Sequence, residues 1–182
     1  METIYVFLAE GFEEVEALTP VDVLRRGGLD VKTVSMNKQK TVKGAHNVPV
    51  ECDVLFEDAS FGNAAMLILP GGLPGATNLN AHEGLRKLIQ DMNASQKPLA
   101  AICAAPMVYG ELGLLEGKKA TCYPGFDKFL KGAEYTARLV EQDGNFITGK
   151  GPGASMAFAF AILEHFCGKE KADELKAGMM VE

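Results

Sequence analysis

A short apolar run reaches a cysteine flanked by small residues in the segment Leu99-Ala100-Ala101-Ile102-Cys103-Ala104-Ala105-Pro106. The run has the composition of a buried parallel strand. The chain continues with Met107-Val108-Tyr109-Gly110-Glu111-Leu112, a helical pattern. Pro106 suits the first turn of a helix, because the N–H that it lacks is not needed there. The segment therefore predicts a strand that passes directly into a helix, with Cys103 at the junction.

This junction has the layout of a nucleophile elbow, here as Ala-x-Cys-x-Ala where hydrolases have Gly-x-Ser-x-Gly. Ala101 and Ala105 are the small neighbours that such a tight turn needs. A helix N-terminus beside the sulfur favours the thiolate, so the layout predicts a lowered pKa for Cys103. The other interpretation is that Cys103 is a buried small hydrophobe, which is common for free cysteines.

Composition and charge argue against several classes of protein. The 182 residues suffice for one domain, 1–182, and 47% hydrophobic with 23% charged residues is ordinary for a globular protein. A net charge of -6 without a basic cluster argues against nucleic-acid binding. No apolar run is long enough for a membrane span, and the acidic start does not resemble a secretory signal. The four cysteines form no zinc-binding pattern, so we expect free thiols in a reducing cytoplasm and no metal.

Strands and helices alternate along almost the whole chain. The expected strands are 4–9, 29–36, 65–69, 99–102, 119–123 and a hairpin of 138–141 with 145–148. The expected helices are 13–26, 85–92, 106–112, 154–166 and 169–177. Residues 37–63 are expected to form a small excursion and a loop. This alternation predicts an α/β fold, with a mostly parallel sheet and helices on both faces.

Three of the expected strands end at residues that can carry chemistry. The first leads to Glu16, the third to Gly71-Gly72 and the fourth to Cys103. Ligands of parallel sheets gather at these carboxyl ends. The glycines either direct backbone N–H groups at a negative charge or form a plain turn. Glu16 either carries a proton beside the thiol, with its pKa raised by burial and like charge, or is a solvated acid in a first helical turn.

Two further features give no support for a cofactor or a Cys–His pair. None of the three histidines, His46, His82 and His165, adjoins Cys103 in the sequence. The stretch 149–154 fits a loose dinucleotide-binding pattern, but no later strand completes a βαβ unit. We expect instead a loop that lets the last helix approach the sheet closely, and no bound cofactor.

Four motifs together resemble the ThiJ/PfpI superfamily. They are Gly11-Phe12-Glu13-Glu14-Val15-Glu16-Ala17, Leu69-Pro70-Gly71-Gly72, Ala100-Ala101-Ile102-Cys103-Ala104-Ala105-Pro106 and Gly151-Pro152-Gly153. Within it, the chain is most similar to the DJ-1 family, the branch of Parkinson disease protein seven, and to bacterial ThiJ-like proteins. The resemblance covers nearly the whole chain. It implies a flavodoxin-like three-layer sandwich with a cysteine elbow, and a homodimer.

The resemblance also assigns roles to particular residues. The reactive cysteine is Cys103, and its acid is Glu16, protonated and hydrogen-bonded to the sulfur. The backbone donors of an oxyanion site are those of Gly71, Gly72 and Ala104. Many relatives carry a His-Pro pair whose histidine lies near the cysteine, and here that pair is Tyr123-Pro124. A general base of suitable pKa is therefore missing, and Tyr123 is only a pocket candidate.

Two main functions follow from the resemblance. In the first, the Cys103 thiolate attacks a small reactive carbonyl or an early glycation adduct, as in glyoxalase- or deglycase-like enzymes, with Glu16 as proton carrier. In the second, Cys103 is a sensor of oxidants that proceeds to the sulfinate, and a dimer acts as a redox-regulated chaperone. A third function, a role in thiamine thiazole-phosphate synthesis, is suggested only by the name ThiJ, and no feature of the sequence supports it. Peptidase activity is not expected, because the protease-like branch has histidine where this chain has Ala104.

Overall fold

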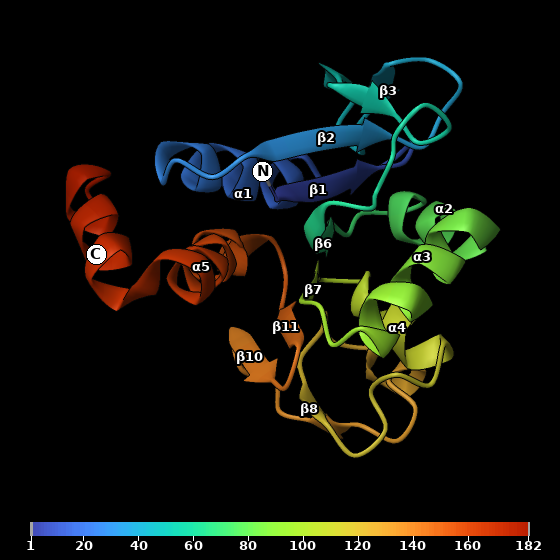
Figure 1. Cartoon of the computed structure of the whole chain (residues 1–182). Helices are drawn as coiled ribbons and strands as arrows, with labels where there is room; N and C mark the ends of the chain where they lie inside the picture. The colour runs from blue at the N-terminus through green and yellow to red at the C-terminus, as the bar shows by residue number, and fades with distance from the viewer. Residues whose placement is uncertain (1, 182) are drawn as a thin grey trace.

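The fold is built on one seven-stranded sheet with the strand order β10-β11-β7-β6-β1-β2-β5 (Figure 1). Neighbouring strands are parallel except for the antiparallel pair β10 and β11. The computed structural model describes residues 2–181. The strands of this sheet are β1 (Thr3–Leu8), β2 (Val31–Ser35), β5 (Val54–Leu55), β6 (Ala64–Leu69), β7 (Leu99–Ile102), β10 (Val140–Asp143) and β11 (Phe146–Gly149).

The strand order reverses direction between β1 and β6. The chain passes from β1 to β2 on one side, and then returns to place β6 on the other side of β1. The connections that follow β1 and β6 therefore leave in opposite directions. In open α/β sheets this reversal point, at the carboxyl ends of the strands, is where ligands bind. In this chain the segments that meet there contain Glu16 and Gly71-Gly72.

Helices cover both faces of the sheet (Figure 1). On one face α1 (Glu14–Arg26) packs against α5 (Ser155–Gly178), and the other face carries α2 (Gly75–Ala81), α3 (Glu83–Ala94) and α4 (Pro106–Glu111). Side chains alternate along a strand. In β1, Val6 therefore joins the core with α1 and α5, and Phe7 joins the core with α2, α3 and α4. Burial on both faces explains the uninterrupted apolar runs, and the predicted three-layer α/β fold is confirmed.

The region 37–63 contains more regular structure than the sequence predicted. Strands β3 (Thr41–Lys43) and β4 (Pro49–Glu51) form an antiparallel pair, and β5 adds to the edge of the main sheet beside β2. These strands have two or three residues each. Segments so short cannot display the alternation by which a strand is recognised in a sequence.

Several short elements elsewhere in the chain also differ from the expectation. Helix α2 was not predicted, because its seven residues are too few for a helical period to show. The strand expected at 119–123 is confined to β8 (Lys119–Ala120), which pairs with β9 (Glu134–Tyr135) outside the main sheet. The remaining elements are two short 3₁₀ helices, η1 (Asp127–Phe129) and η2 (Pro152–Ala154).

The C-terminal part agrees with the prediction. Strands β10 and β11 form the expected hairpin. The two helices expected at 154–166 and 169–177 are the two halves of α5, which is interrupted at Gly168 by a φ of 80°. A Cβ on Gly149 would lie 3.0 Å from the Phe158 ring of α5, so this glycine permits the close approach of the last helix that was predicted.

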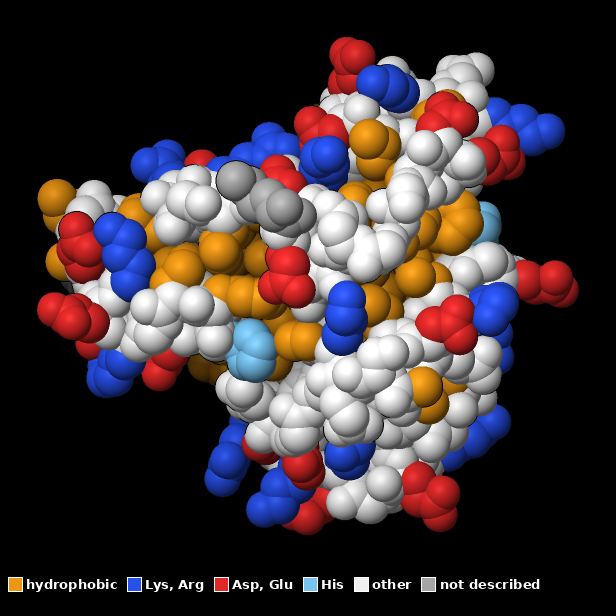
Figure 2. All heavy atoms as spheres, viewed as in Figure 1, with side chains coloured by type: hydrophobic (Ala, Val, Ile, Leu, Met, Phe, Trp, Pro, Cys, Tyr) orange, Lys and Arg blue, Asp and Glu red, His pale blue; other side chains and the backbone are white. Residues whose placement is uncertain are grey.

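The surface shows no broad region of one charge on the face in Figure 2, where basic and acidic side chains are interspersed around apolar ones. Within residues 2–181, no helix combines the length and the apolar character needed to cross a bilayer.

Candidate active site around Cys103

Cys103 occupies a strained turn between β7 and α4. Its φ is 66°, in the left-handed region that residues with a side chain seldom adopt. Such a conformation costs on the order of 1–3 kcal/mol and persists only where the surroundings impose it. Here two backbone hydrogen bonds do so, because the Cys103 N–H donates to the Gly149 carbonyl at 2.9 Å and its carbonyl accepts from the Tyr123 N–H at 2.8 Å. The turn presents the side chain at the carboxyl end of the sheet, where it is 9% exposed.

Glu16 lies in the first turn of α1 and is fully buried. Its Oε2 accepts a hydrogen bond from the Gly71 N–H at 2.8 Å. The Cys103 thiol approaches the same carboxyl. It forms no well-aligned bond to Oε1, however, which has no hydrogen-bond partner among the described residues. The interpretation of Glu16 as a solvated surface acid was therefore wrong.

Burial determines the protonation of Glu16. Removal from water raises the pKa of this carboxyl from 4.5 to about 7, although the nearby Cys103 thiol and the hydrogen bond from the Gly71 N–H oppose the shift. The negative charge of Glu13 adds a smaller upward contribution to the pKa. Near neutral pH this carboxyl is therefore able both to give and to accept a proton.

The Cys103 thiol differs from the sequence expectation of a lowered pKa. Burial raises its pKa, and the charge and hydrogen bonding of Glu16 raise it further. Backbone N–H groups of Ala104 and Gly72 act in the other direction, because both are directed at the sulfur. The sequence argument considered only the helix N-terminus, whereas burial and the neighbouring carboxylate dominate. Because the two acidic groups are so close, they titrate as a pair, and a thiolate is favoured when Glu16 takes up the proton.

The two glycines after β6 have different tasks. A Cβ on Gly71 would lie 2.6 Å from Glu16 Oε2 and 2.7 Å from Cys103 Cβ, so only glycine fits between these side chains. Its N–H was expected to face an oxyanion, but Glu16 already accepts it. Gly72 has a φ of 86°, and its N–H is directed at the sulfur. Gly72 and Ala104 therefore remain as the pair of expected donors at Cys103.

Tyr123 lies beside the cysteine turn. Its backbone N–H binds the Cys103 carbonyl, while its half-exposed ring packs near Gly151. The ring borders an open cleft of about 350 Å³. The lining residues are Tyr123, Pro124, Leu139, Lys150, Gly151, Pro152, Gly153 and Ala154. No hydrogen bond or ion pair within residues 2–181 connects a histidine to Cys103.

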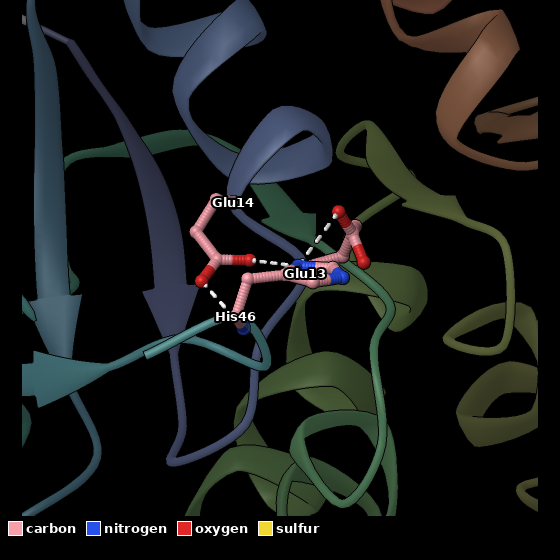
Figure 3. Close-up of side chains that lie close together, drawn as sticks. All are labelled: Glu13, Glu14 and His46. Carbon is pink, nitrogen blue, oxygen red and sulfur yellow. Dashed lines mark hydrogen bonds and ion pairs between the residues drawn. The ribbon is translucent and has the colours of Figure 1, made fainter. Parts of the chain in front are cut away.

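A second cluster of ionisable groups, at the start of α1, was not found from the sequence. Figure 3 shows the His46 ring between the carboxyl groups of Glu13 and Glu14. Its Nδ1 lies 2.8 Å from Glu14 Oε2 and 3.6 Å from Glu13 Oε1. In the described part of the chain these are the residues whose arrangement suits a metal ion. More than thirty positions separate His46 from Glu14, and no spacing pattern in the sequence indicates that they meet.

Comparison with known proteins gives matches over most of the chain. A sequence model described as the DJ-1/PfpI family matches residues 2–165. Protein DJ-1 homolog B of Arabidopsis thaliana is 40% identical over 176 residues, which are 96% of this chain and 40% of that protein, so this chain spans less than half of the plant relative. Deglycase PfpI of Pyrococcus furiosus is 33% identical over 148 residues, 80% of this chain and 87% of that protein.

The fold is shared over its full length with a solved structure. A mutant of a DJ-1 superfamily protein from Salmonella typhimurium superposes with a TM-score of 0.95 at 30% identity, and the match covers 100% of both chains. The family match, over residues 2–165, spans the segments that carry Glu16, Gly71-Gly72 and Cys103. This chain belongs to the DJ-1/PfpI family.

Proposed function

We propose that this protein is a cysteine-centred stress-response protein that acts on small reactive carbonyls, in the manner of a glyoxalase or deglycase. The observation that carries the proposal is the Glu16–Cys103 pair. A fully buried carboxyl with a pKa near neutrality adjoins a thiol on a strained turn, and two backbone N–H groups face the sulfur. The deglycase name of the archaeal relative supports the same substrate class.

The pair supplies what addition to a carbonyl requires. Glu16 accepts the thiol proton, and the Cys103 sulfur forms a bond to the carbonyl carbon. The electron pair of the carbonyl then moves to its oxygen, where the N–H groups of Gly72 and Ala104 stabilise the charge. Glu16 returns the proton to that oxygen, which gives a neutral hemithioacetal. Because its pKa lies near the working pH, Glu16 suits both transfers.

One observation favours oxidant sensing as a second candidate. Within residues 2–181 no hydrogen bond joins the Tyr123 phenol to Cys103, and the groups that shift the pKa of the thiol include the Glu16 carboxyl but not this phenol. A single proton carrier is sufficient for oxidation of a thiol and for stabilising the product. With Glu16 protonated, its O–H and the two backbone N–H groups are donors for the oxygens of a sulfinate.

Turnover of methylglyoxal to lactate, followed by NMR, separates the two candidates. Under the carbonyl proposal the wild type forms lactate, Cys103→Ser does not, and Cys167→Ser is unaffected as a control for loss of a partly exposed thiol. Equal lactate formation by Cys103→Ser contradicts the carbonyl proposal. No turnover by the wild type, combined with selective oxidation of Cys103 by peroxide, supports the sensor.

We also propose a homodimer that uses α1, as the family resemblance implies. Val15 and Leu18 are exposed on this helix, at 50% and 37%, and the ion-paired Arg26 lies at its end. An apolar patch with a charged rim is typical of a protein interface. Analytical ultracentrifugation at micromolar concentration is expected to give a dimer, and Val15→Glu is expected to weaken it. A wild type that sediments only as a monomer contradicts the proposal.

A further inference from the structure

We propose that Glu13, Glu14 and His46 form a binding site for a divalent first-row transition metal ion, of which Zn²⁺ is the representative, separate from the cysteine site. The donors come from two parts of the chain. Glu13 is the N-cap residue of α1, Glu14 is its first residue, and His46 lies in the turn between β3 and β4. Their candidate ligand atoms all lie within 4.8 Å of one another (Figure 3).

The distances match those around a small metal ion. Zinc binds imidazole nitrogen and carboxylate oxygen at about 2.0–2.2 Å, so two such ligands lie about 3–3.5 Å apart. The two measured separations from His46 Nδ1, 2.8 Å to Glu14 Oε2 and 3.6 Å to Glu13 Oε1, lie on either side of that range. An ion can therefore take the place of the proton between His46 Nδ1 and Glu14 Oε2, with Glu13 Oε1 close enough to complete the ligand set.

Glu14 is held in a fixed position by the opposite turn. It is 8% exposed, and its Oε1 accepts hydrogen bonds from the backbone N–H of His46 at 2.8 Å and of Val48 at 3.4 Å. A Cβ on Gly44 would lie 2.3 Å from this oxygen, so the turn leaves room for Glu14 only because residue 44 is glycine. These bonds occupy Oε1 and leave Oε2 directed at the His46 ring. Outer hydrogen bonds of this kind orient the ligands of metal sites.

Charge and exposure also suit an ion. Within residues 2–181 both ion pairs of Glu13 and Glu14 are made with His46, and no lysine or arginine neutralises the two carboxylates. A neutral imidazole therefore leaves two negative charges, which a divalent cation balances. The His46 side chain is 68% exposed, so the ion has a path of entry and positions open to water.

The donor types favour one class of ion. Imidazole nitrogen suits zinc and its neighbours in the first transition row, whereas calcium and magnesium prefer oxygen ligands alone. An ion here would attach the β3–β4 turn to the start of α1. Glu13 also donates its backbone N–H to the Gly71 carbonyl at 2.9 Å. One ligand of the proposed ion is therefore hydrogen-bonded to the glycine whose own N–H binds Glu16.

The test is a calorimetric titration of chelator-treated, full-length protein with Zn²⁺, repeated with Mg²⁺. The expected result is one Zn²⁺ per chain and much weaker Mg²⁺ binding. His46→Asn and Glu13→Gln are each expected to weaken Zn²⁺ binding about tenfold or more, which is the scale for disturbing a metal site. His165→Asn, an exposed histidine on α5, is the matched control and is expected to bind like the wild type.

Because the chain has four free thiols, the test must distinguish this site from sulfur ligation. X-ray absorption at the zinc edge is expected to show only nitrogen and oxygen neighbours, without sulfur at about 2.3 Å. Cys103→Ser is expected to keep the affinity. Sulfur in the first shell, loss of binding in Cys103→Ser, unchanged binding in His46→Asn and Glu13→Gln, or no saturable binding would each overturn the proposal.

Discussion

Replacing Glu16 by glutamine is expected to make the protein more stable than the wild type at alkaline pH. The same substitution removes the group that we propose carries the proton of Cys103. Glutamine has the same shape and keeps an oxygen for the Gly71 N–H, so the substitution removes the charge and little else. In the wild type, folding must bury this carboxyl. At low pH it is neutral in both the folded and the unfolded chain, and burial then costs no ionisation energy.

The size of the effect follows from the raised pKa. The unfolded chain loses this proton at about 4.5 and the folded protein at about 7. Between these values the unfolded state gains stability by ionising while the folded state does not. Each unit of pKa difference corresponds to about 1.4 kcal/mol, so the wild type loses about 3 kcal/mol relative to Glu16→Gln as the pH rises from 4.5 to above 7.

Urea unfolding at pH 4.5, 6 and 8 measures this difference. The free energy of unfolding of Glu16→Gln minus that of the wild type is expected to increase with pH. Glu51→Gln, at an exposed glutamate of β4, is the matched control for loss of one charge and is expected to give a small, constant difference. A difference for Glu16→Gln that stays constant, or that falls as the pH rises, refutes the argument that burial raises this pKa.

Three further predictions concern the same site. Gly71→Ala is expected to lower the free energy of unfolding in urea by about 1–3 kcal/mol and to abolish activity, because its methyl group would meet Glu16 and Cys103. Gly153→Ala is the control and is expected to keep the stability of the wild type, because the space around Gly153 is open. Tyr123→His is expected to raise turnover of methylglyoxal, since imidazole has a pKa near neutrality, and an unchanged rate would mean that the missing histidine is not limiting. Under graded peroxide, mass spectrometry is expected to find two added oxygens on Cys103 before any other cysteine, because Glu16 can accept its proton; earlier oxidation of Cys167 contradicts this.

The elements that the sequence predicted are those whose physical cause lies in neighbouring residues. The long apolar runs of β1, β6 and β7 indicate burial on both faces, and their alternation with helices indicates a parallel sheet. The cysteine turn was predicted because small residues and Pro106 adjoin Cys103 directly. The elements that were missed, such as β3, β4 and α2, are too short for a period to appear, and they form because the main sheet and its loops hold them.

The sequence by itself therefore determined the α/β architecture, the position of Cys103 at the end of a central strand, and the residues that lie near it. Only the tertiary structure decided their chemistry. The pKa of Glu16 depends on complete burial, and that of Cys103 on burial and on Glu16, which is remote in sequence. The same is true of His46, which reaches Glu13 and Glu14 only because the β3–β4 turn folds over the start of α1. Desolvation and charge contacts depend on distance in space, and a sequence read along the chain does not specify that distance.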